Sequence, residues 1–293
     1  MNGIFATVYG PSKTGKSTCT GAAGACGLFI ANSGGLLPLK NFLGLAKVNV
    51  ISAKNVDEAA KIILKEAGKH PTIVVDDFSL LTEQTITQLE ASHSFGEMWR
   101  SLRAQVLRVR DAARTATEKG THVIFNCHAS PPKTSSGKYV RGGPSLPGQL
   151  PEQFSAFSDV VARVVFDETA APWKFVLKTS SDSEYIGGDR LAIFPPSGPM
   201  NLAEALRAAG YELPRPKEME WAEAVVHKTS ELILNEGIEQ WREVLRKVAG
   251  KLDAKKDPKH IRWALEDSLH RAIILNSKKS IVESLFQEQE DGW

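Results

Sequence analysis

Short apolar runs alternate with helical patterns over the first two thirds of the chain. Strands are predicted where apolar and β-branched residues follow one another with little polar interruption, at residues 4–9, 27–32, 47–52, 72–75 and 121–127. Helices are predicted where apolar residues recur at intervals of three and four, at residues 16–25, 56–68, 79–92 and 97–118. Apolar strands separated by helices are typical of a parallel sheet covered on both faces, so the pattern predicts an α/β fold with a mostly parallel central sheet.

The pattern changes after the fifth predicted strand. Residues 129–150 are predicted to be irregular, and strands near 159–166 and 173–180 lie close enough in sequence to form an antiparallel extension of the sheet. After a proline-rich stretch the chain carries only helical patterns. We therefore expect a core over residues 1–212 and an all-helical C-terminal appendage over residues 213–293.

The first predicted strand runs directly into a glycine-rich octapeptide. Gly10-Pro11-Ser12-Lys13-Thr14-Gly15-Lys16-Ser17 has the complete G-x-x-x-x-G-K-S pattern between a strand and a helix, the context expected of a phosphate-binding loop. Backbone N–H groups and the helix N-terminus would face the phosphates of ATP, Lys16 would approach the β- and γ-phosphates, and Ser17 would bind Mg²⁺. The candidate nucleotide-binding residues are Gly10, Pro11, Ser12, Lys13, Thr14, Gly15, Lys16, Ser17 and Thr18.

Two carboxylates follow the predicted strand at 72–75. Asp76 is the candidate for the acid that holds Mg²⁺ at the end of an apolar strand, about sixty residues after the phosphate-binding loop. Asp77 has two predicted roles of equal weight: it would polarise the attacking water, or it would cap the turn that follows.

A histidine ends the predicted strand at 121–127. Ligands of open α/β sheets bind at the carboxyl ends of the strands, so Asn126 and His128 are candidates to face the γ-phosphate. The alternative for His128 is a structural role, with its ring satisfied by loop backbone.

The predicted irregular stretch is cationic and contains no acidic residue. Lys133, Lys138, Tyr139 and Arg141 combine positive charge with one aromatic ring, which suits contact with a phosphate backbone and stacking on a base. They are therefore candidate residues for binding single-stranded DNA. The alternative is a solvated, disordered loop.

Further arginines have more than one interpretation. One face of the helix at 97–118 carries four of them and would face nucleic acid, a neighbouring subunit or solvent: Arg100, Arg103, Arg110 and Arg114. Arg190, in Gly187-Gly188-Asp189-Arg190, is a candidate finger reaching the nucleotide of an adjacent subunit, or an ordinary arginine of a turn.

Composition and charge indicate the cellular compartment of the protein and say little about its activity. The 293 residues carry a net charge of +2, so any attraction to nucleic acid has to come from a local patch. Three cysteines without zinc spacing fit reduced thiols. No signal peptide precedes the first strand and no apolar run approaches a membrane span, so we expect a cytoplasmic protein without a membrane partner.

The order of these motifs resembles the phage-encoded RecA-like ATPases, which are core-only RecA relatives often described as phage nucleotide-binding or single-strand annealing proteins. The resemblance covers roughly residues 1–212 and is carried by the phosphate-binding loop, Val74-Val-Asp-Asp77, Gly120 to His128, Gly143 to Gln149, and Gly188-Asp-Arg190. It implies a RecA-like P-loop core, ATP with Mg²⁺, homo-oligomers with nucleotide sites between subunits, and single-stranded DNA as a partner.

By the same likeness, the site residues receive roles. Lys16, Ser17 and Asp76 would carry nucleotide and metal, His128 would be the sensor at a strand end, and residues 133–141 would contact DNA. Two departures weaken the expectation of fast hydrolysis. Relatives usually have an acid at the end of the second strand, whereas Ala31-Asn-Ser-Gly-Gly35 contains none. Relatives also tend to have a lysine two residues before the arginine, at the position where this chain has Gly188.

The sequence thus predicts an ATPase that assembles on single-stranded DNA in phage recombination or replication. A first alternative is a nucleotide-binding structural or assembly module with little turnover. A second is a small-molecule phosphotransferase, although residues 129–150 hold one arginine and such enzymes need an arginine-rich lid. A third is a DNA-packaging or virion motor. The acidic C-terminal end, Glu288 to Trp293, is a candidate contact for a protein partner or a frayed terminus.

Overall fold

A ten-stranded mixed sheet forms the centre of the computed structural model, which describes residues 2–31, 36, 39, 48–135, 137–166, 175–192, 197–199 and 202–214. The strands along its main path are β1 (Phe5–Gly10), β2 (Leu28–Ala31), β3 (Asn49–Ile51), β4 (Thr72–Asp76), β5 (His122–Ser130), β9 (Val160–Phe166), β10 (Phe175–Lys178) and β12 (Ser197–Pro199). Their order is β12-β10-β9-β1-β5-β4-β2-β3. The short strands β8 (Gly143–Pro144) and β11 (Gly188–Asp189) pair with β5 and β9.

Parallel pairing runs through the middle of the sheet. β1 pairs in parallel with β5 and β9, and β4 pairs in parallel with β5 and β2. β10 is antiparallel to β9 and to β12. The predicted mostly parallel sheet and its antiparallel extension are therefore confirmed. In this order β5 stands between the phosphate-binding strand β1 and the strand β4 that carries Asp76.

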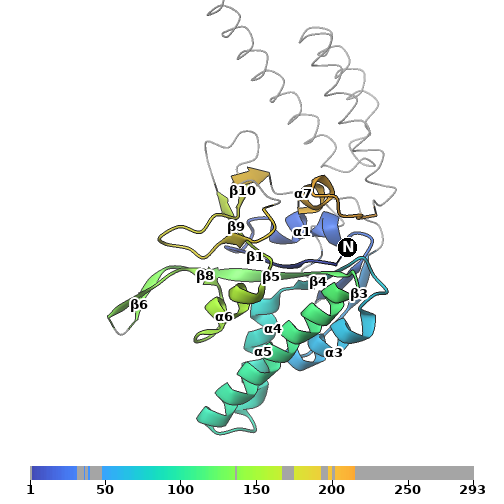
Figure 1. Cartoon of the computed structure of the whole chain (residues 1–293). Helices are drawn as coiled ribbons and strands as arrows, with labels where there is room; N and C mark the ends of the chain where they lie inside the picture. The colour runs from blue at the N-terminus through green and yellow to red at the C-terminus, as the bar shows by residue number, and fades with distance from the viewer. Residues whose placement is uncertain are drawn as a thin grey trace, which may run out of the picture.

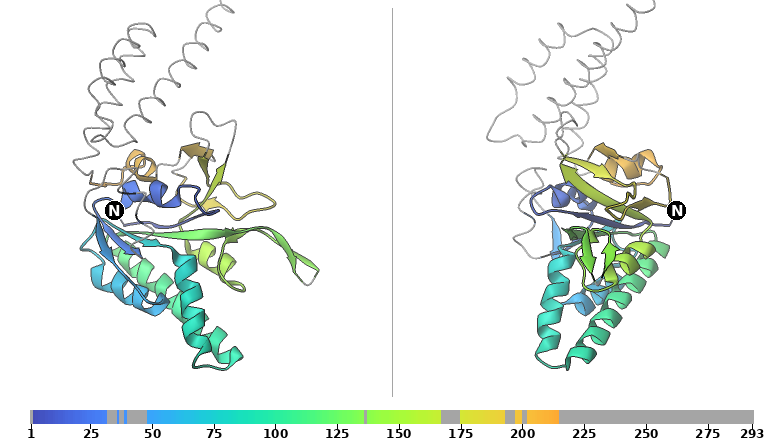
Figure 2. Two further views of the ribbon diagram at one scale, coloured as in Figure 1. Left: turned by 180° about the vertical axis from the view of Figure 1, so that it is seen from behind. Right: turned by 90° about the vertical axis from the view of Figure 1, so that its left-hand side faces the viewer.

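Helices cover both faces of the sheet, as Figures 1 and 2 show. The first face carries α1 (Lys16–Gly24) and α7 (Leu202–Ala208), and the second carries α3 (Val56–Glu66), α4 (Phe78–Glu90), α5 (Phe95–Glu118) and α6 (Leu150–Phe157). Each face has its own apolar core. On the second face the rings of Phe5, Phe78, Phe125 and Phe154 pack with centroids 5.0–5.4 Å apart.

The prediction that residues 129–150 are irregular is wrong, because parts of this stretch form strands and the start of a helix. β5 continues to Ser130, and β6 (Lys133–Ser135) and β7 (Lys138–Val140) form an antiparallel hairpin that projects beyond the sheet (Figure 1). Gly137, at φ +73, makes the reversal between them possible. Helix α6 also begins here, although its periodicity is short and Pro151 stands in its first turn, where proline is tolerated.

Some predictions lie outside the described residues. They include residues 32–35 at the end of the second strand and, apart from 213 and 214, the whole helical appendage predicted at 213–293. Among the residues that the structure describes, no helix is both long and apolar enough to cross a membrane.

His122, at the start of β5, makes the fold sensitive to acid. Its ring is buried, Nδ1 accepts a hydrogen bond from the backbone N–H of Ile4 at 3.2 Å, and burial lowers its pKa from 6.5 to about 4. As the pH falls from 6.5 to 4 the unfolded chain binds a proton that the folded chain does not. The free energy of unfolding should therefore fall by up to about 3 kcal/mol over this range.

Denaturant unfolding at several pH values tests this expectation. In His122→Gln, which keeps a neutral acceptor, the loss of stability between pH 6.5 and 4 should shrink, whereas His93→Gln, at an exposed histidine, should leave it unchanged. Equal slopes in His122→Gln and the parent chain would contradict the assignment.

Candidate nucleotide site

The phosphate-binding loop folds as a compact turn between β1 and α1. Lys13 and Gly15 have left-handed backbone angles, at φ 63 and 86. A Cβ on Gly10 would lie 2.9 Å from the carbonyl oxygen of Val164, so glycine is needed where β1 passes β9. The Thr14 hydroxyl donates to the Pro11 carbonyl at 2.9 Å, which closes the loop on itself. Helix α1 then begins at Lys16, as predicted.

Lys16 lies inside this loop. Its Nζ donates to the carbonyl oxygens of Gly10 at 3.0 Å and Pro11 at 2.8 Å, and its side chain is buried. Burial lowers the pKa of Lys16, and the carboxylates of Asp77 and Asp76 act in the opposite direction. A buried cation held by two neutral carbonyls has an unmet demand for a negative partner, which the phosphates of ATP would supply.

The Asp76 carboxylate is the centre of a polar network at the end of β4. Ser17 Oγ donates to Asp76 Oδ2 at 3.0 Å, and Asn126 Nδ2 donates both to Asp76 Oδ1 and to Thr20 Oγ1 at 2.8 Å. Burial raises the pKa of the Asp76 carboxyl, and the hydrogen bonds from Asn126 and Ser17 lower it. Asn126 therefore orients Asp76 rather than facing the γ-phosphate. Thr20, which completes the network, was missed; its place four residues after Lys16 on one helix face was the available signal.

This donor set fits Mg²⁺. One carboxylate and one hydroxyl oxygen lie within a hydrogen bond of each other, and Mg²⁺ in phosphate sites commonly takes one or two protein ligands besides phosphates and water. Within the described ranges, no group of three or more His, Cys, Asp or Glu side chains could hold a metal without a nucleotide. Ser17 and Asp76 are thus the residues that would hold the ion, together with the phosphates of ATP.

The side chains of Asp77 and His128 contact each other at the carboxyl ends of β4 and β5. Asp77 Oδ1 caps α4 by accepting the N–H groups of Ser79 at 3.1 Å and Leu80 at 3.3 Å, while Oδ2 lies 2.6 Å from His128 Nε2. The peptide bond between Asp76 and Asp77 is cis. His128 lies opposite Gly10 in the β1–β5 register, at the carboxyl end of the sheet. Asp77 therefore caps the helix through one carboxylate oxygen and orients the His128 imidazole through the other.

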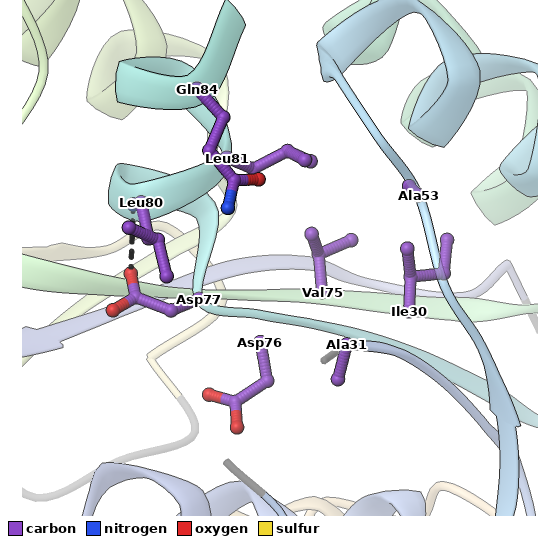
Figure 3. A pocket seen from close by; sticks show the side chains of 9 residues that line it. All are labelled: Ile30, Ala31, Ala53, Val75, Asp76, Asp77, Leu80, Leu81 and Gln84. Carbon is purple, nitrogen blue, oxygen red and sulfur yellow. Dashed lines mark hydrogen bonds between the residues drawn. The ribbon is translucent and has the colours of Figure 1, made fainter. Parts of the chain in front are cut away.

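A pocket of about 170 Å³ adjoins Asp76 and Asp77 (Figure 3). Figure 3 shows Ile30 and Val75 directed toward the side of the sheet where Gln84 lies, and Ala31 and Asp76 directed toward the other. Ala31 lies opposite Asp76 in the β2–β4 register, so β2 brings no carboxylate beside Asp76 over its described residues. With no carboxylate from β2, Asp77 and His128 are the predicted residues that are left as candidates to act on an attacking water.

Arg190 does not reach the nucleotide site of its own chain. Its backbone N–H donates to the Asp159 carbonyl at 2.9 Å and its guanidinium donates to the Ala156 carbonyl. It follows β11, which pairs with the start of β9 at Val160. Because β9 is parallel to β1, this end of the sheet is opposite to the end where Gly10 lies. Any role of Arg190 in hydrolysis would therefore need a second copy of the chain.

Two of the four arginines predicted to share one face of α5 are half-buried and two are exposed. Arg110 lies over the ring of Phe157 at 4.3 Å, and Arg114 donates to the Phe157 carbonyl and, at 3.0 Å, to Asp159 Oδ1, so both contact the C-terminal end of α6 in the same chain. Arg100 and Arg103 are exposed. Two of the four arginines are thus structural, which corrects the interpretation of a single basic surface.

The basic hairpin presents its predicted residues beyond the sheet edge. Lys133 is exposed, and the Tyr139 ring is 57% exposed opposite Thr134 in the β6–β7 register. Lys138 belongs to β7. Arg141, at the base of the hairpin, is exposed and donates from Nη1 to Ser181 Oγ at 2.9 Å. The structure thus gathers on one hairpin the cations that the sequence predicted for a loop.

Comparison with known proteins agrees with a nucleoside triphosphatase core. A search of curated proteins found no match. Among solved structures, the KaiC-like protein PH0186 from Pyrococcus horikoshii OT3 is similar at 17% identity and a TM-score of 0.38, over 64% of this chain and 83% of that one. The family model described as AAA domain matches residues 2–191. Since this match spans well over half of the residues, the chain belongs to the AAA domain family of P-loop ATPases.

Proposed function

We propose that this P-loop ATPase binds single-stranded DNA through its basic hairpin and hydrolyses ATP in response, in phage recombination or replication. The observation that carries the proposal is the continuity of β5. Asn126 and His128 lie in the carboxyl-terminal half of this strand and belong to the candidate nucleotide site, and the strand ends two residues after His128, at Ser130, three residues before the hairpin begins at Lys133. One strand therefore connects ATP with the candidate DNA surface.

Chemically, the site has the parts needed for phosphoryl transfer. Lys16 and a Mg²⁺ ion held by Ser17 and Asp76 would neutralise charge that develops on the γ-phosphate. His128, whose ring contacts Asp77, would hold the attacking water. Arg190 of a neighbouring copy would complete the site, because this residue lies at the opposite end of the sheet from its own loop. Hydrolysis would then depend on assembly into homo-oligomers.

ATP hydrolysis with and without single-stranded DNA, at two salt concentrations, tests the proposal. We expect DNA to raise turnover, and we expect the stimulation to fade as salt rises, because contacts with phosphates release counterions. Turnover that is independent of DNA at both salt concentrations would overturn the assignment of the hairpin.

Substitutions in the hairpin separate charge from stacking. Tyr139→Ala should weaken binding of single-stranded DNA about tenfold with an unchanged dependence on salt, because base stacking is uncharged. Lys133→Ala should reduce the slope of log affinity against log salt by about 0.7. Fluorescence anisotropy of a labelled oligonucleotide measures both, with Lys65→Ala on the exposed side of α3 as the control. Unchanged affinity and slope in both hairpin variants would count against DNA binding at this surface.

A nucleotide-binding assembly module with little turnover is the second candidate. It is favoured by the sequence at the end of the second strand, Ala31-Asn-Ser-Gly-Gly35, which has no acid to activate the attacking water. Tight binding of ATP with negligible release of phosphate, even with DNA present, would select this alternative.

A further inference from the structure

A turn over residues 181–186, called here the 181–186 turn, joins parts of the molecule that are distant in sequence. The turn is fixed by its own aspartate, since Asp182 Oδ1 accepts the backbone N–H groups of Glu184 at 2.9 Å and Tyr185 at 2.6 Å. The side chain of Arg163, on β9, holds it from the sheet side. Its guanidinium lies 3.8 Å from the centre of the Tyr185 ring and 3.1 Å from Asp182 Oδ2. The turn is therefore an ordered part of the described structure.

The base of the basic hairpin is bonded to this turn. Gly142 donates its N–H to the Glu184 carbonyl at 2.7 Å, and its carbonyl accepts the N–H of Ile186 at 2.9 Å. Arg141 adds its bond to Ser181 Oγ. A Cβ on Gly142 would lie 2.6 Å from the Tyr185 ring, so only glycine leaves room for that ring at the base of the hairpin. A displacement of the hairpin would therefore be passed to the turn.

The phosphate-binding strand is bonded to the same turn. Tyr9, the residue before Gly10, is fully buried, and its hydroxyl donates to the Ile186 carbonyl across 177 positions of sequence. Burial raises the pKa of Tyr9 above its usual range, so the hydroxyl remains a donor. A phenylalanine would occupy the same space, and the hydroxyl thus contributes a connection rather than volume.

The turn also leads directly to the candidate finger. Gly187 follows Ile186, and a Cβ there would lie 2.5 Å from the Ser180 carbonyl, so this segment is held tightly against the start of the turn. Arg190 follows three residues later, anchored through its backbone to Asp159. Hairpin, phosphate-binding strand and Arg190 thus meet at one short segment.

We propose that Tyr9 is a positioning residue that, through the 181–186 turn, couples the basic hairpin and Arg190 to the phosphate-binding loop. The coupling rests on the proposed function, since it supposes that the hairpin binds single-stranded DNA. Tyr9 contacts neither phosphate nor DNA. Its hydroxyl holds the strand that ends at Gly10 to a segment whose position depends on the hairpin.

Tyr9→Phe tests the coupling with three separate measurements. We expect ATP affinity, DNA affinity and turnover without DNA to stay within twofold of the parent chain, while the stimulation of turnover by DNA falls about fivefold or more. Tyr211→Phe is the matched control, because it removes the same hydroxyl from a tyrosine that packs on His122 at the start of β5. Arg163→Gln, which releases the turn without changing Tyr9, should lower the stimulation in the same way.

The outcomes distinguish the coupling from the proposed function. If the parent chain is stimulated by DNA and both Tyr9→Phe and Arg163→Gln are stimulated equally, the coupling is wrong and the proposed function stands. If the parent chain neither binds nor responds to single-stranded DNA, the proposed function fails and the coupling fails with it. A merely structural role of the hydroxyl would lower the melting temperature and affect turnover with and without DNA alike, which also overturns the coupling.

Discussion

Lys16→Ala should weaken the binding of ATP by about 100-fold or more. The Nζ of Lys16 is a buried cation, and in this structure two neutral carbonyl oxygens, of Gly10 and Pro11, are its hydrogen-bond acceptors. Binding of a triphosphate would replace those weak partners with anionic oxygens, so the stronger interaction of Lys16 would contribute to the free energy of ATP binding. Removing the amine removes that gain and leaves the triphosphate charge without its nearest counter-charge.

Isothermal titration calorimetry with ATP and Mg²⁺ measures the effect. Lys65→Ala, at an exposed lysine of α3, removes the same charge without touching the loop and should bind ATP as the parent chain does. A melting curve of Lys16→Ala shows whether the fold is kept, since the loop carbonyls lose a donor but can turn to water. Unchanged ATP affinity in a folded Lys16→Ala chain would refute the site assignment.

Much of the nucleotide site could be predicted because its signals are local in sequence. The loop from Gly10 to Ser17 carries its own backbone conformation, and Asp76 ends a strand whose apolar run is unambiguous. Two such strands of a parallel sheet bring their carboxyl ends to one edge, which is why Ser17 and Asp76 meet. Pattern and topology together were sufficient for these residues.

The remaining features depend on contacts that no local pattern records. Asp77 was predicted either to polarise the attacking water or to cap the next turn. The structure shows the cap through Oδ1, whereas Oδ2 contacts His128, a partner that neither predicted role included. Periodicity places Arg110 and Arg114 on a polar face, but the end of α6, a helix that the sequence did not predict, packs against these two residues. The bond between Tyr9 and Ile186 joins residues too far apart for any spacing rule.

Asp76→Asn should lower the turnover of ATP by about 100- to 1000-fold while leaving a stable fold. The carboxylate would hold Mg²⁺ with Ser17, and an amide lacks the charge that draws the ion to the γ-phosphate. The fold should tolerate the change, because burial already raises the pKa of Asp76 and the neutral amide avoids the cost of a buried charge.

Three measurements make this prediction specific. The melting temperature of Asp76→Asn should not fall below that of the parent chain, binding of ATP without Mg²⁺ should change by no more than a few fold, and the gain in affinity on adding Mg²⁺ should be lost. Asp111→Asn is the control, since Asp111 is an exposed carboxylate of α5 paired with Arg110. These three results separate a metal ligand from a structural acid. Loss of a structural acid would lower the melting temperature and would leave the effect of Mg²⁺ on ATP affinity unchanged. Turnover of Asp76→Asn within threefold of the parent chain would exclude Asp76 from the metal site, and the network with Ser17 and Asn126 would then serve only to join α1, β4 and β5.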